Sequence, residues 1–136
     1  MATDRIISEP ITYFGADGRM KLEVRSESLT CDGATEVTSG LIPAGCFLLG
    51  VSTRVTTAVT DAGANTYDVG IGGGDTDLWG AGIAGTLGTT SDMSDFTDAA
   101  ASGIYTAATE VTLTPDTADF ATGVVLVVAY FLQAVP

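Results

Sequence analysis

Residues 51–60 alternate strictly between two sets of side chains, and this pattern constrains the fold more than any other feature of the chain. The two sets are Val51, Thr53, Val55, Thr57 and Val59 on one side, and Ser52, Arg54, Thr56, Ala58 and Thr60 on the other. Successive side chains of a β-strand point to opposite faces, so a period of two that is rich in Val and Thr is typical of a strand. We therefore expect a long strand over residues 46–60, with Gly50 marking a bulge.

Shorter strand candidates, separated by turn signals, continue along the rest of the chain. They cover residues 20–24, 35–37, 66–71, 76–79, 104–106, 109–114 and 124–132. Residues 91–101 are the single helical candidate, with Ser91 as a cap, and an irregular loop is the open alternative there. The spacing predicts an all-β fold, a β-sandwich or jelly roll of about seven to eight strands.

The first 28 residues differ in composition from the remainder. Four of the five basic residues lie within the first 25 positions: Arg5, Arg19, Lys21 and Arg25. A chain of 136 residues is long enough for one domain with a substantial core. We expect residues 1–28 to form an extended N-terminal arm or a first hairpin, and residues 29–136 to form the β-sandwich domain.

The closing strand candidate, residues 124–132, is apolar at both odd and even positions. Such a strand must be covered on both faces, and the sandwich core covers one of them. A second subunit would cover the other face, or a loop or the N-terminal arm would do so. With a second subunit, we expect Val125, Val127 and Phe131 to form the oligomer interface.

The net charge of −12 excludes several classes of function. Residues 28–136 contain twelve acidic residues and one basic residue, Arg54. Binding to nucleic acid depends on clustered Lys and Arg, and anionic membranes attract the same residues, so neither is an expected partner. The first residues lack the apolar run of a signal peptide, and residues 123–132 are too few to span a bilayer, so we expect synthesis and folding in a cytosol.

The residue types needed for common chemistry are scarce. Without any His there is no base for a nucleophilic triad, and Cys31 and Cys46 lack partners for a zinc site. Cytosolic synthesis favours two free buried thiols over a disulfide. Gly80, Gly82 and Gly85 match a dinucleotide-binding pattern, but the residues that follow form a poor helix, so tight turns explain them better.

One candidate ion site consists of loop carboxylates: Asp75, Asp77, Asp92, Asp95 and Asp98. Their spacing does not match a calcium-binding helix–loop–helix, and solvated loop carboxylates are the favoured interpretation. We therefore expect no enzyme activity, no cofactor and no bound metal.

Three strings resemble a segment pattern of small structural proteins of tailed phages. They are LIPAGCFLLGVSTRVTTAVT at residues 41–60, TYDVGIGGGDTDLWG at residues 66–80, and a closing pattern with VTLT at 111–114, Phe120, Gly123 and residues 124–130. The resemblance covers residues 41–132. It implies a compact β-sandwich or jelly-roll module, most like the capsid decoration (cement) proteins, which are commonly trimers.

From this resemblance we expect a homotrimer that binds the major capsid protein on the outside of the virion head and stabilises the shell. The expected docking residues are Arg5, Arg19, Lys21 and Arg25, which can pair with an acidic shell surface, so deletion of residues 1–15 should abolish shell binding. The alternative is a receptor- or glycan-binding module of a tail fibre or spike. That alternative predicts an exposed Trp79 or Tyr67.

Overall fold

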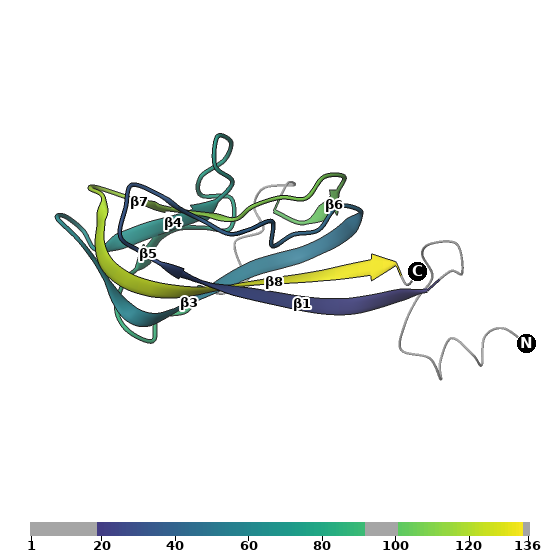
Figure 1. The fold of residues 1–136 in the computed structure, drawn as a ribbon, viewed down its shortest axis with the longest axis horizontal. Helices are drawn as coiled ribbons and strands as arrows, with labels where there is room; N and C mark the ends of the chain where they lie inside the picture. The colour runs from purple at the N-terminus through teal and green to yellow at the C-terminus, as the bar shows by residue number, and fades with distance from the viewer. Residues whose placement is uncertain (1–18, 92–100, 135–136) are drawn as a thin grey trace, which may run out of the picture.

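The computed structural model describes residues 19–91 and 101–134, which form two four-stranded antiparallel sheets (Figure 1). The strands are β1 (Met20–Thr30), β2 (Glu36–Val37), β3 (Cys46–Asp61), β4 (Thr66–Gly70), β5 (Gly80–Ala84), β6 (Gly103–Tyr105), β7 (Thr112–Pro115) and β8 (Phe120–Ala134). The first sheet has the order β1-β8-β3-β6, and the second has the order β2-β7-β4-β5. The predicted all-β sandwich is confirmed. The helix considered for residues 91–101 falls almost entirely on residues outside the described part of the chain.

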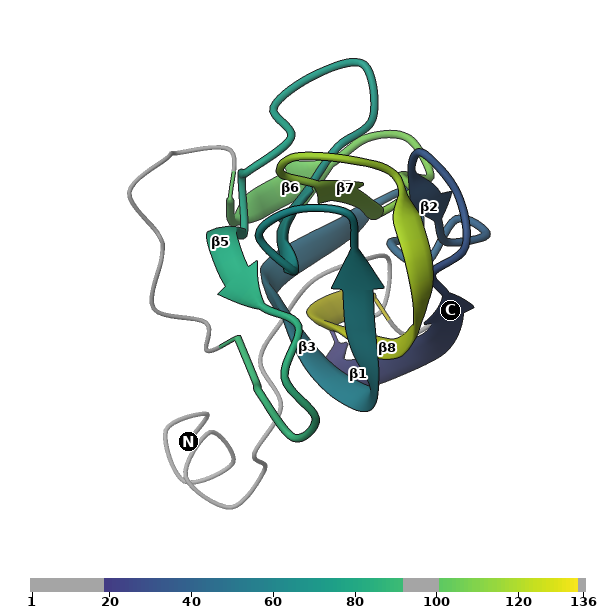
Figure 2. The ribbon, with the colours of Figure 1, turned by 90° about the vertical axis from the view of Figure 1, so that its left-hand side faces the viewer.

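Consecutive strands alternate between the two sheets, except that β4 and β5 are neighbours in the second sheet. This winding is that of a jelly roll. The end-on view shows β2 and β7 on the opposite side of the sandwich from β1 and β8 (Figure 2). The expected strand over residues 76–79 is wrong, because these residues form turns and the strand β5 follows them.

Strands β3 and β8 form the centre of the first sheet and pair along most of their length. The alternation of residues 51–60 has its expected effect: Val51, Val55 and Val59 are buried, whereas Arg54 is exposed. The predicted bulge is also present, since the register shifts between Leu48 and Gly50. A further shift between Val55 and Thr57 leaves Thr57 exposed, so the alternation breaks at that position.

The odd-numbered residues of β8 face the core of the single chain. Val125, Val127, Ala129 and Phe131 all have an exposed fraction of 0 %. A fully buried side chain has no surface left to offer a second copy. We therefore correct the predicted oligomer interface of Val125, Val127 and Phe131: these residues pack between the two sheets, and the even-numbered residues of β8 face outward.

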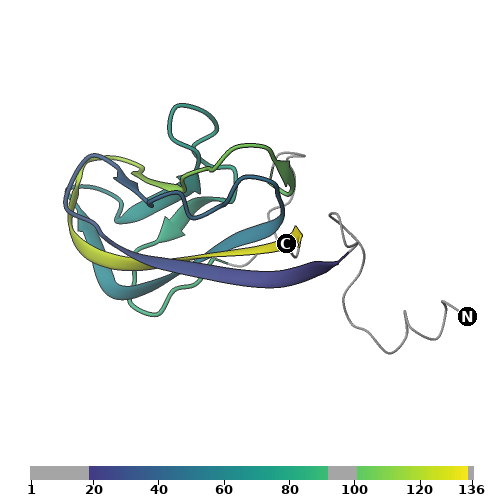
Figure 3. The same ribbon diagram turned by 45° about the vertical axis from the view of Figure 1, so that its right-hand side comes forward.

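Strand β1 pairs with β8 along its whole length, from Met20 opposite Ala134 to Thr30 opposite Val124. The expected division between residues 28 and 29 therefore falls inside a strand of the first sheet. Residues 20–28 belong to the sandwich, and the arm expected over residues 1–18 lies outside the described residues. The first residues of β1 extend beyond the second sheet (Figures 1 and 3).

Two glycines allow close approach to the backbone and side chain of Val59. A Cβ added to Gly85 would lie 2.6 Å from the Val59 carbonyl oxygen, and a Cβ on Gly123 would lie 2.7 Å from the Val59 Cα. Gly123 also has a φ of 138°, which favours glycine. Gly85 directly follows β5, which contains Gly80 and Gly82, so the glycine pattern has none of the strand–turn–helix context of a dinucleotide site.

Candidate functional site

The projecting end of β1 carries a cluster of charges on its inner side, which we call the charged end (Lys21, Glu23 and Arg25). The Lys21 Nζ lies 3.2 Å from Glu23 Oε2, and the Arg25 Nε lies 3.0 Å from Glu23 Oε1. The hydrogen bond from Lys21, followed by the one from Arg25, lowers the pKa of the Glu23 carboxyl. Two cations around one carboxylate leave the charged end with a net positive charge. It lines an open pocket together with Gln133 and Ala134.

The structure places three of the four expected docking residues. Lys21 and Arg25 come together around Glu23, and Arg19 lies directly before β1 and is exposed. Arg5 lies outside the described residues. The Arg25 guanidinium also covers the ring of Phe131 at 5.4 Å from its centroid, so it closes one end of the core.

The other side of the same sheet is exposed, and we call it the outer face. Paired residues of neighbouring antiparallel strands point to the same side, so the register defines its members. They are Leu22, Val24, Ser26, Ser28 and Thr30 of β1, Phe47, Gly50, Ser52 and Arg54 of β3, Ile104 of β6, and Val124, Leu126, Val128, Tyr130 and Leu132 of β8.

One end of the outer face is apolar across all four strands. Leu22 pairs with Leu132, Leu132 pairs with Phe47, and Phe47 pairs with Ile104. We call these four residues the apolar row. Leu22 is 60 % exposed, Ile104 is 69 % exposed and Phe47 is 37 % exposed. Val24, in the adjoining row, is 52 % exposed beside the partly buried Tyr130.

The outer face is almost free of charge in a strongly acidic protein. None of its residues is acidic, and Arg54 is its single charged residue. Arg54 lies opposite Leu126, about halfway along β3 and outside the apolar row. The sequence did not reveal this surface, because its residues come from four strands and meet through register alone.

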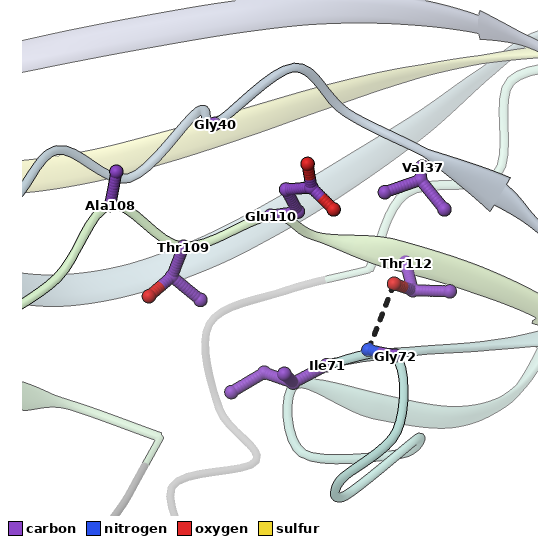
Figure 4. Close-up of a pocket in the computed structure, with 8 residues that line it drawn as sticks. All are labelled: Val37, Gly40, Ile71, Gly72, Ala108, Thr109, Glu110 and Thr112. Atoms are coloured by element: carbon purple, nitrogen blue, oxygen red, sulfur yellow. Dashed lines mark hydrogen bonds between the residues drawn. The ribbon is translucent and has the colours of Figure 1, made fainter.

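An open pocket lies on the second sheet (Figure 4). It is lined by Val37, Gly40, Ile71, Gly72, Ala108, Thr109, Glu110 and Thr112. The Gly72 N–H donates a hydrogen bond of 2.9 Å to Thr112 Oγ1, so this part of the wall is already satisfied within the chain. Among the described residues that line the pocket, none is aromatic and Glu110 alone is charged. These described lining residues do not identify a particular ligand.

The described acidic side chains do not form a metal centre. Asp68 Oδ1 accepts a hydrogen bond of 2.8 Å from the Gly82 N–H, and Thr66 Oγ1 donates to Asp116 Oδ2. Burial, and then the neighbouring carboxylates of Asp116 and Asp77, raise the pKa of Asp68. Among residues 19–91 and 101–134, no group of three or more His, Cys, Asp or Glu side chains is placed to hold a metal ion. Asp92, Asp95 and Asp98 of the candidate ion site lie outside these residues.

The aromatic residues singled out for recognition are part of the core. Trp79 is 3 % exposed, and its Nε1–H donates a hydrogen bond of 2.9 Å to the Ala101 carbonyl. Tyr67 is fully buried, and its hydroxyl lies 3.0 Å from Thr53 Oγ1. Neither ring is available as a platform for a sugar.

The two thiols are also buried. Cys31 and Cys46 are free cysteines, which confirms the expectation of unpaired buried thiols. Burial raises the pKa of Cys31 to about 12, and it also raises the pKa of Cys46. A thiol that stays protonated is a poor nucleophile, so these two residues have a packing role.

In the described part of the chain, no helix is both long and apolar enough to cross a membrane. Comparison with protein families and with curated proteins finds no match to this chain.

Proposed function

We propose that this chain is a decoration (cement) protein of a tailed-phage head, which binds the major capsid protein on the outer shell as a homotrimer and stabilises the shell. The observation that carries the proposal is the projecting end of β1. Its inner side is charged through Lys21 and Arg25, and its outer side is apolar through Leu22 and Val24. One strand end thus presents two chemically different surfaces, as a subunit that contacts both a shell and its own copies requires.

The location of the resembling strings supports the same function. Residues 46–60 lie within β3, residues 66–80 run from β4 to the start of β5, and the closing pattern covers β7 and most of β8. These strands form the centre of both sheets, so the resemblance concerns the core of the jelly roll. Jelly rolls serve in viral capsids and also in lectins, so the fold supports the proposal only by analogy.

The charged end is suited to an acidic shell surface, because a carboxylate of the shell can replace Glu23 as the partner of Lys21 or Arg25. Such exposed pairs contribute about 0.2–1 kcal/mol each and are screened by salt. Docking through this end should therefore be sensitive to ionic strength. Repetition over several copies of a trimer would raise the overall affinity.

Co-sedimentation with heads of the phage that encodes the chain tests the proposal. The wild-type chain should pellet with heads at low salt, and Lys21→Gln should bind about twofold to fivefold more weakly per subunit. Val37→Glu on the second sheet is the matched control, since it lowers the net charge by the same unit and should pellet like wild type. Failure of the wild-type chain to pellet would contradict the proposal, and so would equal loss in both variants.

The alternative, a receptor- or glycan-binding tail module, expects an exposed Trp79 or Tyr67. Both side chains are buried, so this expectation is not met. Quantitative mass spectrometry of purified particles separates the two locations. A decoration protein is present in many copies per head, whereas a tail-tip module is present in a few.

A further inference from the structure

We infer that copies of this chain associate through the outer face of the β1-β8-β3-β6 sheet, with the apolar row of Leu22, Leu132, Phe47 and Ile104 at the centre of the contact. This inference deepens the proposed function by naming the surface between copies. It rests on the register, exposure and charge of the single chain, so it can be tested without a phage shell.

The first argument is the continuity of the apolar surface. The apolar row crosses all four strands without interruption, and Val24 and Tyr130 extend it along β1 and β8. Four of these side chains are among the most exposed large hydrophobic residues in the described chain: Leu22, Val24, Phe47 and Ile104. Scattered exposed apolar residues need no explanation, but a contiguous patch marks a contact surface.

The second argument is charge, and it selects a second copy as the occupant. Two copies with a net charge of −12 repel each other over most of their surfaces. Acidic residues are absent from the outer face, so two copies can approach there without bringing carboxylates together. A strongly basic partner would instead be drawn to the acidic remainder of the chain, and the neutral outer face offers it no complementary charge.

The third argument concerns the edge of the sheet, where copies could instead pair strand to strand. Strand β1 is an 11-residue edge strand, and it carries Lys21, Glu23, Arg25 and Glu27 on its inner side. Inward-pointing charges of this kind are a known protection against edge-to-edge pairing. At the opposite edge, β6 has only three residues. Contact between copies through the outer face is therefore favoured over extension of the sheet, and it allows a closed ring of three copies with the apolar rows around its axis.

The test uses a matched pair of valines on opposite sheets. Val24 of β1 is 52 % exposed on the outer face, and Val37 of β2 is 43 % exposed on the second sheet. Val24→Glu places a carboxylate in the contact and should weaken self-association at least about tenfold, because an unpaired charge is costly to bury. Val37→Glu changes the net charge equally and should associate like wild type. Sedimentation velocity over a concentration series measures both, and circular dichroism checks folding.

Two further measurements cover the case in which Val24→Glu does not fold. Ile104→Glu places a charge on β6, at the other end of the apolar row, and should also weaken association. Hydroxyl-radical footprinting of the wild-type chain needs no substitution: oxidation of Leu22, Phe47 and Ile104 should fall as the chain associates, whereas Leu87, which is 64 % exposed, should be unchanged.

Three results would overturn the inference: a wild-type chain that stays monomeric, outer-face variants that associate like Val37→Glu, or footprints at Leu22 and Ile104 that do not depend on concentration. A monomer whose outer face is protected at every concentration would mean that residues 1–18 cover it. An oligomer through this face that does not pellet with heads would refute the proposed function alone. A pelleting chain with an unprotected outer face would refute this inference alone.

Discussion

The Arg25 guanidinium carbon lies 5.4 Å from the centroid of the Phe131 ring. The sequence suggested separate roles for these residues, shell docking for Arg25 and contact between copies for Phe131. The structure instead joins them, because Arg25 is exposed on the inner side of β1 while Phe131 is fully buried beside it. The charged end is therefore attached directly to the end of the core.

Removing this cover should destabilise the fold. We expect Arg25→Ala to lower the free energy of unfolding by about 0.5–1 kcal/mol, the value of a cation–π contact at an exposed site. Arg25→Lys should retain part of this, since it keeps the positive charge. Urea denaturation measures the loss, with Arg54→Ala as the control at below about 0.5 kcal/mol. Equal effects of Arg25→Ala and Arg54→Ala would contradict the contact.

The buried hydroxyl of Tyr67 makes the free energy of unfolding decrease with pH in the alkaline range. Burial raises the pKa of Tyr67 to about 12, against 10.0 for a free side chain. The folded state thus disfavours the phenolate, so this contribution is complete below about pH 10 and is lost as the pH rises toward 12 and beyond. Cys31, with a pKa of about 12, contributes a loss in the same direction, beginning near pH 9.

Tyr67→Phe should therefore do two things. It removes the hydrogen bond to Thr53 and should cost about 1 kcal/mol at pH 7. It should also make the fall in stability between pH 10 and 12 less steep than in wild type. Urea denaturation at a series of pH values gives both quantities. Parallel pH profiles for the two proteins would show that Tyr67 does not titrate as described.

Any side chain at position 123 should destabilise the fold. A Cβ there would lie 2.7 Å from the Val59 Cα, and the φ of 138° is unfavourable for other residues. We expect Gly123→Ala to cost about 1–3 kcal/mol, the usual range for overpacking. Gly74→Ala is the control, because its Cβ would meet Ile71 at ordinary contact distances of 3.7 Å and more. Thermal unfolding compares the two, and a stable Gly123→Ala would contradict the close approach.

Asp68→Asn should stabilise the chain at neutral pH. Burial and nearby carboxylates raise the pKa of Asp68 in the fold, so stability is higher when it is protonated and is lost as the pH rises through that raised pKa. The asparagine keeps an oxygen for the Gly82 N–H and removes the charge. We expect a gain of less than about 1 kcal/mol at pH 7, since the site is near solvent.

The same gain should disappear in acid, where Asp68 is protonated in the folded and unfolded states alike. Asp119→Asn on the exposed segment before β8 removes the same charge and serves as the control. Denaturation curves at pH 7 and at pH 3 measure the difference. A gain for Asp68→Asn that persists in acid would mean that its carboxylate is not the cause.

The sequence predicted the central strand β3, whose side chains alternate between buried and exposed. It failed where the side-chain pattern has no clear period or is apolar on both faces. Residues 51–60 carry alternating burial in their side-chain types, so β3 was visible. Strand β5 was missed because Gly80–Ala84 contains mostly small residues without a period. In β8 both faces are apolar, so composition could not decide which one faces the core, and Val125, Val127 and Phe131 were assigned to the wrong face.

The outer face illustrates a different limit. Leu22, Phe47, Ile104 and Leu132 are far apart along the chain and become neighbours only through the pairing of four strands. Each is unremarkable as a single apolar residue in the sequence. The charged end was nearer to prediction, because Lys21, Glu23 and Arg25 follow one another with the period of a strand and so lie on one side of it.

The molar mass of the purified full chain in solution tests the central claim most directly. Light scattering over a concentration series should give three times the mass of one chain, and the trimer should dissociate on dilution before the fold is lost. A mass equal to that of one chain at every concentration would contradict an assembly built on the outer face.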